Sequence, residues 1–479
     1  MRLRHDIGGQ PTEGTGHREV LDAPDACPLY EVPEATDADI DRAVGLAAEA
    51  FRSWRRSTQS ERSAVLRGAA ARLRERRREL GAALVRETGR VTDLAIGEVD
   101  GAARILDQYA QVDLAESGRV VNRASSRVWG VEVAEPLGVA ALISAWNVPL
   151  QLAAHKVGAA LAAGCTAVLK PSPLAAAAVQ GLADALYAAG LPRGVLSVLH
   201  GGADTARSLL ARPEVRVVSF TGGDAAGRDI MAAASDGLKK VVLELGGKSA
   251  NAVFADAPMD RVVDGLVAGF TRNQGAVCTA ATRILIQRRV YDEVVERLSR
   301  AVKNLRVGDP YTSGPEIGAL RHAELADTMD TVLAGSRLRA GVTVTGGERV
   351  EVAGRTGSYR APALIAAERA ADVPLARREL FTPVAVVVPF DDEDELVAAV
   401  DDSDYGLAAG LWTGDVERAE RIWDRLTVGT VYLNSYHRID AIPLASGGRR
   451  ASGFGSEGGR RGVEEFMAPK SIHFPRTGW

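Results

Sequence analysis

Short apolar runs separated by helical segments fill the middle of the chain. The runs VAALISAW, TAVLK, VRVVSF, VVLEL and NAVFA are largely apolar throughout rather than alternating. That pattern is typical of strands buried on both faces of a parallel sheet. We expect helices between them, over residues 150–163, 176–189, 203–211 and 225–237. This β-α-β order predicts a doubly wound α/β domain of the dinucleotide-binding type.

A second α/β domain is predicted further along. After residue 257 the alternation resumes, and its predicted strands are TRILIQ, APALIAA, TPVAVVVPF, GLAAGLWT and GTVYLN. Strands alternating with helices again predict a mainly parallel sheet covered by helices.

Helices precede the first domain. Thr36 and Asp39 form a capping-box-like start for a helix that continues to Phe51, and residues 60–88 and 92–115 are also predicted to be helical. The run RLRERRREL within residues 60–88 could belong to a helix that binds nucleic acid. The leucines and glutamates among its arginines favour instead an amphipathic helix with a solvated charged face.

Two further segments depart from the helix–strand alternation. Residues 118–136 alternate between apolar and polar positions, which predicts an exposed two-stranded excursion. The glycine-rich chain after residue 445 ends in a similar short segment, SIHF. Residues 136–154 carry no charge, but their prolines and polar side chains are incompatible with a helix in lipid. We expect a strand, a turn and a helix there, and no membrane span.

Composition narrows the class of protein. The 479 residues are 46% hydrophobic and 25% charged, as in a soluble globular protein of two or three domains. Lys and Arg number 58 against 62 Asp and Glu, so no basic excess indicates nucleic acid or an anionic membrane. Cys27, Cys165 and Cys278 are too few for a disulfide framework or a four-cysteine zinc site. We expect a reduced, cytoplasmic protein without a metal.

Five positions carry candidate chemistry. Asn147 and Lys170 each follow a buried strand, at the end where open α/β sheets bind ligands, with a turn residue and a solvated lysine as the alternatives. Residues 220–227 (FTGGDAAG) form a glycine-rich strand-to-helix turn suited to phosphate, although without the G-x-G-x-x-G spacing, and the alternative is a tight turn with no ligand. Burial of Glu244 would raise its pKa toward that of a general base, the alternative being a structurally paired glutamate. Cys278 is a candidate nucleophile, or an inert small apolar residue.

The order of these motifs resembles one family. SAWNVP, LKPS, FTGG, LELGGKSAN, NQGAVC, ELFTPV and GGRRASGFGSE are similar to successive motifs of the aldehyde dehydrogenase superfamily, from about residue 31 to the C-terminus. The resemblance implies two doubly wound α/β domains plus a β oligomerisation arm. Its implied boundaries are residues 1–117 and 137–245 for the dinucleotide-binding domain, 246–433 for the catalytic domain, and 118–136 with 434–479 for the bridging element. Pairing of that element across subunits predicts a homodimer or homotetramer.

The resemblance also implies a reaction, the oxidation of an aldehyde to a carboxylic acid with NAD or NADP. Cys278 would attack as a thiolate, giving a thiohemiacetal and then a thioester, so we expect a depressed thiol pKa. The Asn147 side-chain amide and the Cys278 backbone N–H would hold the oxyanion, with Lys156 close by. Glu244 would activate the hydrolytic water.

Two alternatives stay open for the function. Relatives that pass the thioester to coenzyme A typically lack the glutamate, so Glu244 favours a free carboxylate product. A catalytically inactive, cofactor-binding structural protein is the other alternative. Joint retention of Cys278, Glu244 and Asn147 argues against it.

The resemblance assigns a set of residues to the dinucleotide. They are Trp146, Lys170, Ser172, Gly202, Phe220, Thr221, Gly222, Gly223, Leu245, Glu379 and Phe381. The family usually has Ser at position 223 and Gly at position 382, where this chain has Gly223 and Thr382. Many NAD-specific members carry a ribose-binding Glu where this chain has Pro173, and the sequence places no obvious arginine nearby for a 2′-phosphate. NAD or NADP therefore stays open.

Two residues bear on the substrate. Arg272 lies six positions before Cys278, and His155 precedes Lys156. Succinic-semialdehyde-type relatives resemble the chain at Arg272 and carry a second arginine at the position of His155. We therefore expect a small aldehyde with a distal anion, bound by Arg272 with help from His155. The alternative is that Arg272 pairs with a local carboxylate.

Overall fold

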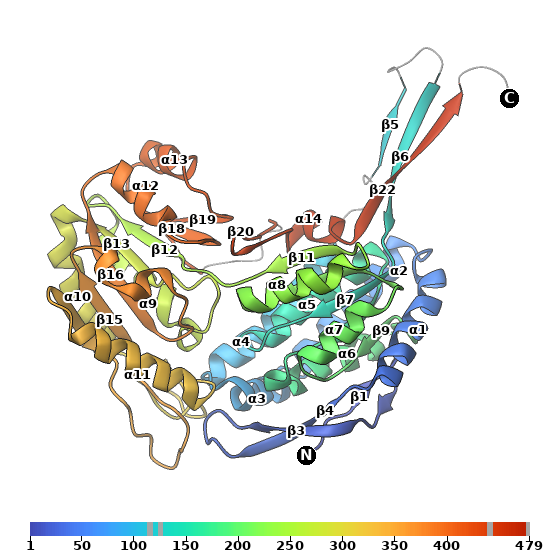
Figure 1. Ribbon diagram of the computed structural model, residues 1–479, viewed down its shortest axis with the longest axis horizontal. Helices are drawn as coiled ribbons and strands as arrows, with labels where there is room; N and C mark the ends of the chain where they lie inside the picture. The colour runs from blue at the N-terminus through green and yellow to red at the C-terminus, as the bar shows by residue number, and fades with distance from the viewer. Residues whose placement is uncertain (113–117, 123–127, 438–443, 476–479) are drawn as a thin grey trace.

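The computed structural model describes residues 1–112, 118–122, 128–437 and 444–475. Two large β-sheets with their helices form two lobes, and a narrow arm projects from one of them (Figure 1). The predicted α/β fold with an additional β arm is confirmed. No helix among the described residues is long and apolar enough to span a membrane.

The first sheet has the strand order β2-β1-β9-β8-β7-β10-β11-β21. Its parallel centre consists of β9 (Leu196–Val198), β8 (Thr166–Lys170), β7 (Val139–Ile143), β10 (Val215–Thr221) and β11 (Lys240–Glu244). The antiparallel edges are β1 (His5–Asp6), β2 (Pro11–Thr12) and β21 (Gly453–Phe454). Edge strands from both ends of the chain therefore flank the predicted parallel core.

Eight helices of the described chain cover this sheet. They are α1 (Asp37–Trp54), α2 (Gln59–Glu75), α3 (Arg77–Thr88), α4 (Thr92–Tyr109), α5 (Pro149–Ala163), α6 (Ala177–Ala188), α7 (Ala203–Ala211) and α8 (Asp224–Ser235). Along β7, Ala140 and Leu142 pack with α2 to α6, whereas Ala141 and Ile143 pack with α1, α7 and α8. Both faces of the strand are therefore buried, which explains its continuous apolar sequence.

Local sequence signals in the first lobe agree with the structure. At the start of α1, the Thr36 hydroxyl accepts from the Asp39 N–H at 3.2 Å and the Asp39 carboxylate accepts from the Thr36 N–H at 3.0 Å, so the predicted capping box is confirmed. The basic stretch of α2 and α3 buries Leu73 and Leu80 in the core, as an amphipathic helix requires.

The second sheet has the order β14-β15-β16-β13-β12-β18-β19. Its strands are β14 (Val342–Gly346), β15 (Ala363–Ala367), β16 (Val384–Phe390), β13 (Arg283–Gln287), β12 (Ala250–Val253), β18 (Ala408–Trp412) and β19 (Thr430–Leu433). The apolar run NAVFA forms β12, which pairs with β13 and β18, so grouping it with the first sheet was wrong. The antiparallel edge strand β14 was not predicted.

Helices cover both faces of the second sheet as well. They are α9 (Met259–Thr271), α10 (Tyr291–Lys303), α11 (Ala323–Arg337), α12 (Glu393–Asp401) and α13 (Val416–Trp423). On β13, Ile284 and Ile286 pack with α9 and α10 on one face of the sheet. Leu285 packs with α11, α12 and α13 on the other face.

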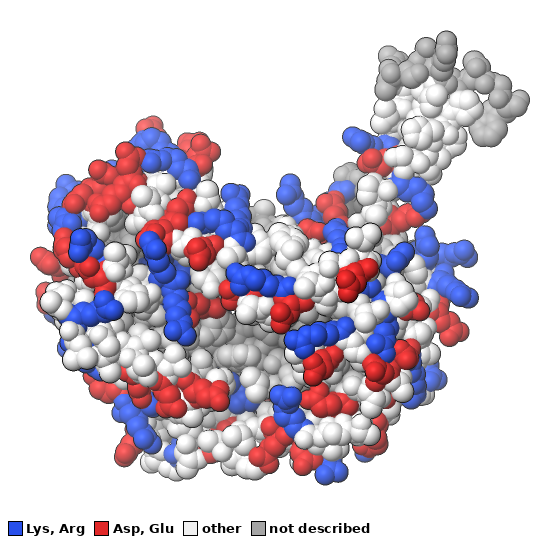
Figure 2. All heavy atoms as spheres, in the orientation of Figure 1, with Lys and Arg blue, Asp and Glu red and all other residues white. Residues whose placement is uncertain are grey.

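The arm contains β5 (Arg119–Val121), β6 (Val128–Pro136) and β22 (Met467–Pro475). The predicted two-stranded excursion pairs as β5 with β6, and β22 adds a third strand from Met467↔Pro136 to Pro475↔Val128. Figure 2 shows an extended uncharged surface on the arm, whereas acidic and basic side chains intermingle over the body of this face. The apolar side chain of Val120 in β5 is 64% exposed.

Smaller elements complete the structure. An antiparallel hairpin of β3 (Thr15–Leu21) and β4 (Pro28–Glu34) lies in the N-terminal region that we left without predicted structure. β17 (Tyr405–Gly406) pairs with β20 (Arg449–Arg450). The short helix α14 (Gly459–Glu464) packs on α5. The domain boundaries at residues 245 and 433 remain a proposal.

Candidate functional site

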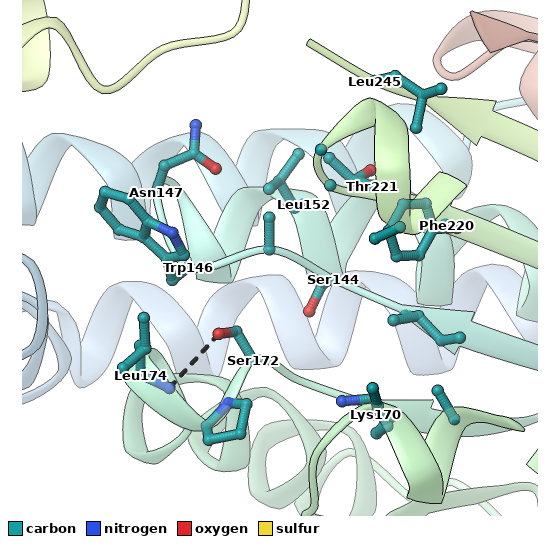
Figure 3. A pocket seen from close by; sticks show the side chains of 18 of the residues that line it. Ser144, Trp146, Asn147, Leu152, Lys170, Ser172, Leu174, Phe220, Thr221 and Leu245 are labelled. Carbon is teal, nitrogen blue, oxygen red and sulfur yellow. Dashed lines mark hydrogen bonds between the residues drawn. The ribbon is translucent and has the colours of Figure 1, made fainter. Parts of the chain in front are cut away.

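A cavity of about 660 Å³ opens at the carboxyl ends of the first sheet's strands. All eleven predicted cofactor residues line it, together with Asn147 and Cys278. They are Trp146, Lys170, Ser172, Gly202, Phe220, Thr221, Gly222, Gly223, Leu245, Glu379 and Phe381. Figure 3 shows how the residues from β7, β8 and β10 converge there. The ends of neighbouring parallel strands meet at one edge, which is where such sheets bind ligands.

The cavity has the features that a dinucleotide requires. Gly223 is the N-cap of α8, with open space beside its α-carbon, so the first N–H groups of this helix can face a phosphate. Ala206 of α7 and Ile230 of α8 provide apolar walls suited to a planar ring. The hydroxyls of Ser144 and Thr221 are buried in the lining and have no partner within the described chain. A polar ligand would satisfy them.

The other end of the cavity is built around Glu379. Its Oε1 accepts from the Gly247 N–H at 3.0 Å, and burial raises its pKa to about 7. Phe381 has a left-handed backbone, with φ 59°, and its ring meets the ring of Trp146 edge to face at 5.8 Å. These residues enclose the end of the cavity at which Cys278 lies.

A strained turn just before Cys278 positions the cysteine in the cavity. Asn273 and Gln274, between α9 and the cysteine, have φ values of 53° and 55°, which cost energy for side chains with a Cβ. Buried amides hold the turn: Asn273 Nδ2 donates to the carbonyl of Asn147 at 2.9 Å and Gln274 Nε2 to that of Ala319 at 3.0 Å. The surrounding structure therefore dictates the position of the cysteine.

The prediction of a low pKa for the Cys278 thiol was wrong. Burial, the main cause, and the nearby carboxylates of Glu379 and Glu244 together raise this pKa to about 12. Both effects disfavour a thiolate. The sequence indicated the nucleophile and assigned both glutamates to the site, but it did not reveal how deeply the thiol is buried among them.

Asn147 lies beside this cysteine, buried at the start of α5. Its Nδ2 donates to the carbonyl of Ala276 at 3.1 Å. Its own carbonyl accepts from the buried guanidinium of Arg90, which pairs with Glu98. Glu98 Oε1 in turn accepts from the Leu150 N–H at 2.8 Å. Arg90 and Glu98 thus anchor the turn that presents the Asn147 amide, a role that their sequence surroundings do not reveal.

Glu244 ends β11 and is half-buried, with its Oε1 atom shielded from solvent. Its Oε1 has no hydrogen-bond partner among the residues that the structure describes. Burial raises the pKa of Glu244 well above its usual range, as predicted, and the charge of Glu457 adds to the effect. A carboxyl group with a raised pKa can accept a proton near neutral pH.

Lys156 of α5 lies in a closely packed polar cluster with His155, Ser219 and Glu457. Its Nζ donates to Glu457 Oε1 at 2.6 Å and to Ser219 Oγ at 2.9 Å, and it is completely buried. Glu457 belongs to the C-terminal motif GGRRASGFGSE, to which we had assigned no catalytic role. The structure therefore adds Glu457 to the charges around Glu244.

The structure separates the two predicted substrate residues. His155 lies in the packed cluster around Lys156, with Nδ1 3.3 Å from the Tyr109 hydroxyl, and burial lowers its pKa. Arg272 is exposed at the end of α9, near Arg90 and His437. Within the described ranges no hydrogen bond or ion pair joins Arg272 to His155, and neither lines the large cavity. Their joint role stays a prediction.

This geometry can be compared with known proteins. The sequence profile of the aldehyde dehydrogenase family matches residues 11–472. The chain belongs to the aldehyde dehydrogenase family.

Solved structures agree along nearly the whole chain. An aldehyde dehydrogenase from Brucella melitensis biovar abortus is 30% identical, with a TM-score of 0.94 and coverage of 99% of this chain and 98% of that one. An NADP-dependent enzyme of E. coli is 31% identical, with the same TM-score and coverage. A betaine aldehyde dehydrogenase of Staphylococcus aureus, in complex with NAD+, is 28% identical, with a TM-score of 0.94 and coverage of 100% and 98%. The protein is an NAD(P)-dependent aldehyde dehydrogenase.

One expectation about this dehydrogenase needs correction. The sequence placed no obvious arginine near Lys170, but the fold brings Arg18 of β3 and Arg207 of α7 into the lining of the same cavity. Arg18 is 152 positions before Lys170 in the chain, so proximity in sequence could not reveal it.

Proposed function

We propose that this aldehyde dehydrogenase oxidises its substrate by covalent catalysis at Cys278 and releases a free carboxylic acid. The observation that carries the proposal is that Cys278 and the Asn147 turn share one cavity with the residues assigned to the dinucleotide. A nucleophile, an amide donor and a cofactor surface in one enclosed space are what this chemistry needs.

In the first stage the Cys278 thiol loses its proton to solvent, and its sulfur forms a bond with the aldehyde carbon. As the carbonyl oxygen becomes an oxyanion, the Asn147 side-chain amide and the Cys278 N–H donate to it. Bound NAD or NADP supplies the acceptor for the hydride that this carbon loses. The carbon then remains attached to Cys278 as a thioester.

The second stage is hydrolysis. Glu244, with its raised pKa, accepts a proton from water, and the water oxygen attacks the thioester carbon. The carbon–sulfur bond breaks, the acid leaves, and the thiol regains a proton. Lys156 and Glu457 lie where they influence the charge of Glu244, so we assign them to support of this base.

In the alternative reaction, coenzyme A instead of water would accept the acyl group from Cys278 in the second stage. The direct test is product analysis of aldehyde turnover with and without coenzyme A, monitored by NAD(P)H absorbance and by mass spectrometry. We expect the free acid in both cases and no turnover by Cys278→Ala. Acyl-coenzyme A as the product, or undiminished turnover by Cys278→Ala, contradicts the proposal. Cofactor binding without NAD(P)H formation from any aldehyde indicates an inactive structural protein.

We further propose that the substrate is a small aldehyde with a distal anion, such as a semialdehyde. Arg272 supports this, because it is exposed six residues before the nucleophile and no ion pair engages it within the described chain. His155 is proposed only as an auxiliary residue, since it faces Tyr109. The test compares kcat/KM for succinic semialdehyde and hexanal in the wild type, Arg272→Ala and His155→Ala. Arg297→Ala, an exposed arginine of α10, is the control. Preference for hexanal that Arg272→Ala leaves unchanged contradicts the proposal.

A further inference from the structure

The large cavity carries an excess of positive charge at the end where Lys170 lies. Lys170 ends β8, and its Nζ donates to the Gly201 carbonyl at 2.9 Å. Arg18 reaches the same place from the N-terminal hairpin: a methyl group at Gly202 would lie 3.4 Å from its Nη2. The charge of Arg18 also contributes to the lowering of the Lys170 pKa, to about 8, although burial is the main cause. Two cations from distant parts of the sequence therefore meet beside Gly202.

The carboxylate nearest to these cations, that of Glu34, already accepts two hydrogen bonds from the protein. Glu34 Oε2 accepts from the Gly202 N–H at 2.8 Å, and Glu34 Oε1 accepts from Arg18 Nη2 at 3.1 Å. Glu34 is not part of the cavity lining, whereas Arg18 and Lys170 are. A guanidinium has five N–H donors, so Arg18 retains donors beyond the one given to Glu34. Asp229 of α8 also lines the cavity, but it pairs with Arg207 at 3.5 Å. Among the described residues around Gly202, the lining therefore offers an anion donors from Arg18 and Lys170.

These cations lie where the sugar of an adenosine would fit. If a flat ring lay between α7 and α8 and phosphates at the start of α8, the connecting sugar would lie beside Gly202, the N-cap of α7. Ser172 and Pro173 complete this part of the lining. Ser172 has a hydroxyl that can donate, and proline has no charge. A phosphate on the sugar would meet Arg18, Lys170 and Ser172.

We propose that Arg18 and Lys170 recognise the 2′-phosphate of NADP and that the enzyme therefore prefers NADP to NAD. This inference rests on the proposed assignment of the cavity to the dinucleotide. Guanidinium and ammonium groups form charge-assisted hydrogen bonds with phosphate, whereas a 2′-hydroxyl offers them only a neutral partner. Arg18 sets the preference for NADP over NAD, because Lys170 can also bind the hydroxyls of an unphosphorylated sugar.

Equilibrium binding of two fragments tests this without any turnover. Calorimetry measures the Kd of 2′,5′-ADP and of 5′-AMP, which differ only in the 2′-phosphate, for the full-length wild type, Arg18→Ala and Arg2→Ala. Arg2 is a matched control, since it forms an exposed ion pair with Glu31 and does not line the cavity. We expect 2′,5′-ADP to bind at least tenfold more tightly than 5′-AMP to the wild type and Arg2→Ala. Arg18→Ala should lose about tenfold for 2′,5′-ADP and less than twofold for 5′-AMP.

A second measurement repeats the binding experiment at a pH where the 2′-phosphate carries less charge. Because its second pKa is about 6, the advantage of 2′,5′-ADP should shrink when binding is repeated at pH 5. Equal affinity for the two fragments, or equal weakening of both by Arg18→Ala, overturns the inference. Failure of both fragments to bind overturns the assignment of the cavity itself. Tight binding with no aldehyde oxidation leaves the inference intact and contradicts the proposed function instead.

Discussion

The guanidinium of Arg90 donates a hydrogen bond to the backbone carbonyl of Asn147, 57 residues further along the chain. Arg90 also donates from Nε to Thr88 Oγ1 at 2.9 Å and pairs with Glu98, so its orientation is fixed on three sides. We therefore treat Arg90 as a positioning residue that acts on the reaction through Asn147.

The conservative variant Arg90→Lys should lower kcat by about tenfold to a hundredfold, because a compact ammonium cannot bridge the same three partners. KM for the cofactor should change less than threefold. Steady-state kinetics with saturating aldehyde measures both constants.

A merely structural role for Arg90 is excluded by combining variants. If Arg90 acts through Asn147, Arg90→Lys should cost far less in an Asn147→Ala background than in the wild type. Independent, additive losses in the double variant would contradict a positioning role.

The Cys278 thiol should react slowly with iodoacetamide in the protein without ligands. Because its pKa is about 12, the rate should rise about tenfold per pH unit from pH 7 to pH 10, with no plateau. Glu244→Gln should accelerate the reaction by removing a nearby carboxylate. Mass spectrometry follows the alkylation in a Cys27→Ser background, since Cys27 is exposed. A plateau near pH 8 would show that the thiol pKa is lowered after all.

Glu244→Gln should separate the two stages of the reaction. The first turnover should still produce NAD(P)H, because the glutamine removes only the base that activates water. Steady-state kcat should fall by about a hundredfold or more, and the thioester on Cys278 should accumulate. Stopped-flow absorbance measures the burst, and intact-protein mass spectrometry detects the adduct. Loss of the burst itself would place Glu244 before hydride transfer.

Lys248→Met should stabilise the protein at low pH. Lys248 is 1% exposed, its Nζ has no hydrogen-bond partner in the described part of the chain, and burial lowers its pKa to about 7. Between pH 7 and about 10.4 the unfolded chain holds a proton that the folded chain releases, so this lysine makes stability rise with pH. The cost of its buried charge is therefore largest below pH 7, on the order of 4 kcal/mol.

Thermal unfolding at pH 6 and pH 9.5 measures this effect. We expect Lys248→Met to raise Tm at pH 6 and to gain much less at pH 9.5. Lys303→Met, an exposed lysine at the end of α10, should change Tm little at either pH. A gain that is independent of pH would indicate a packing effect.

Assembly through the arm predicts that a charge on β5 disrupts the oligomer. Val120 is 64% exposed on this edge strand, and a lysine there should hinder pairing with another subunit. Light scattering after size exclusion should give a dimer or tetramer for the wild type and a smaller species for Val120→Lys. Leu338→Lys, at a position 88% exposed after α11, should leave the mass unchanged. A monomeric wild type would contradict the expected assembly.

Sequence patterns predicted those features that depend on local order. Both parallel sheets were visible because buried strands such as β7 must be apolar on both faces, and the cofactor residues followed because strand ends carry the motifs. Arg18 and Arg90 were not visible, since nothing near them in sequence shows that folding places one beside Lys170 and the other under Asn147. The predicted pKa of the Cys278 thiol was wrong for a similar reason, because it depends first on burial in the folded protein and then on the charge of Glu379, a hundred residues away.

The edge strand β21 has a consequence for the synthesis of the protein. Glu244, the proposed base, lies opposite Gly453 in the β11–β21 pair, and Lys156 meets Glu457. Although the parallel core of the first sheet is complete by residue 244, these partners follow about two hundred residues later in the chain. The first lobe can therefore begin to fold early, but the surroundings of its base form only after that later stretch has been synthesised. Nascent chains that stop before residue 453 should bind nucleotide without hydrolysing a thioester.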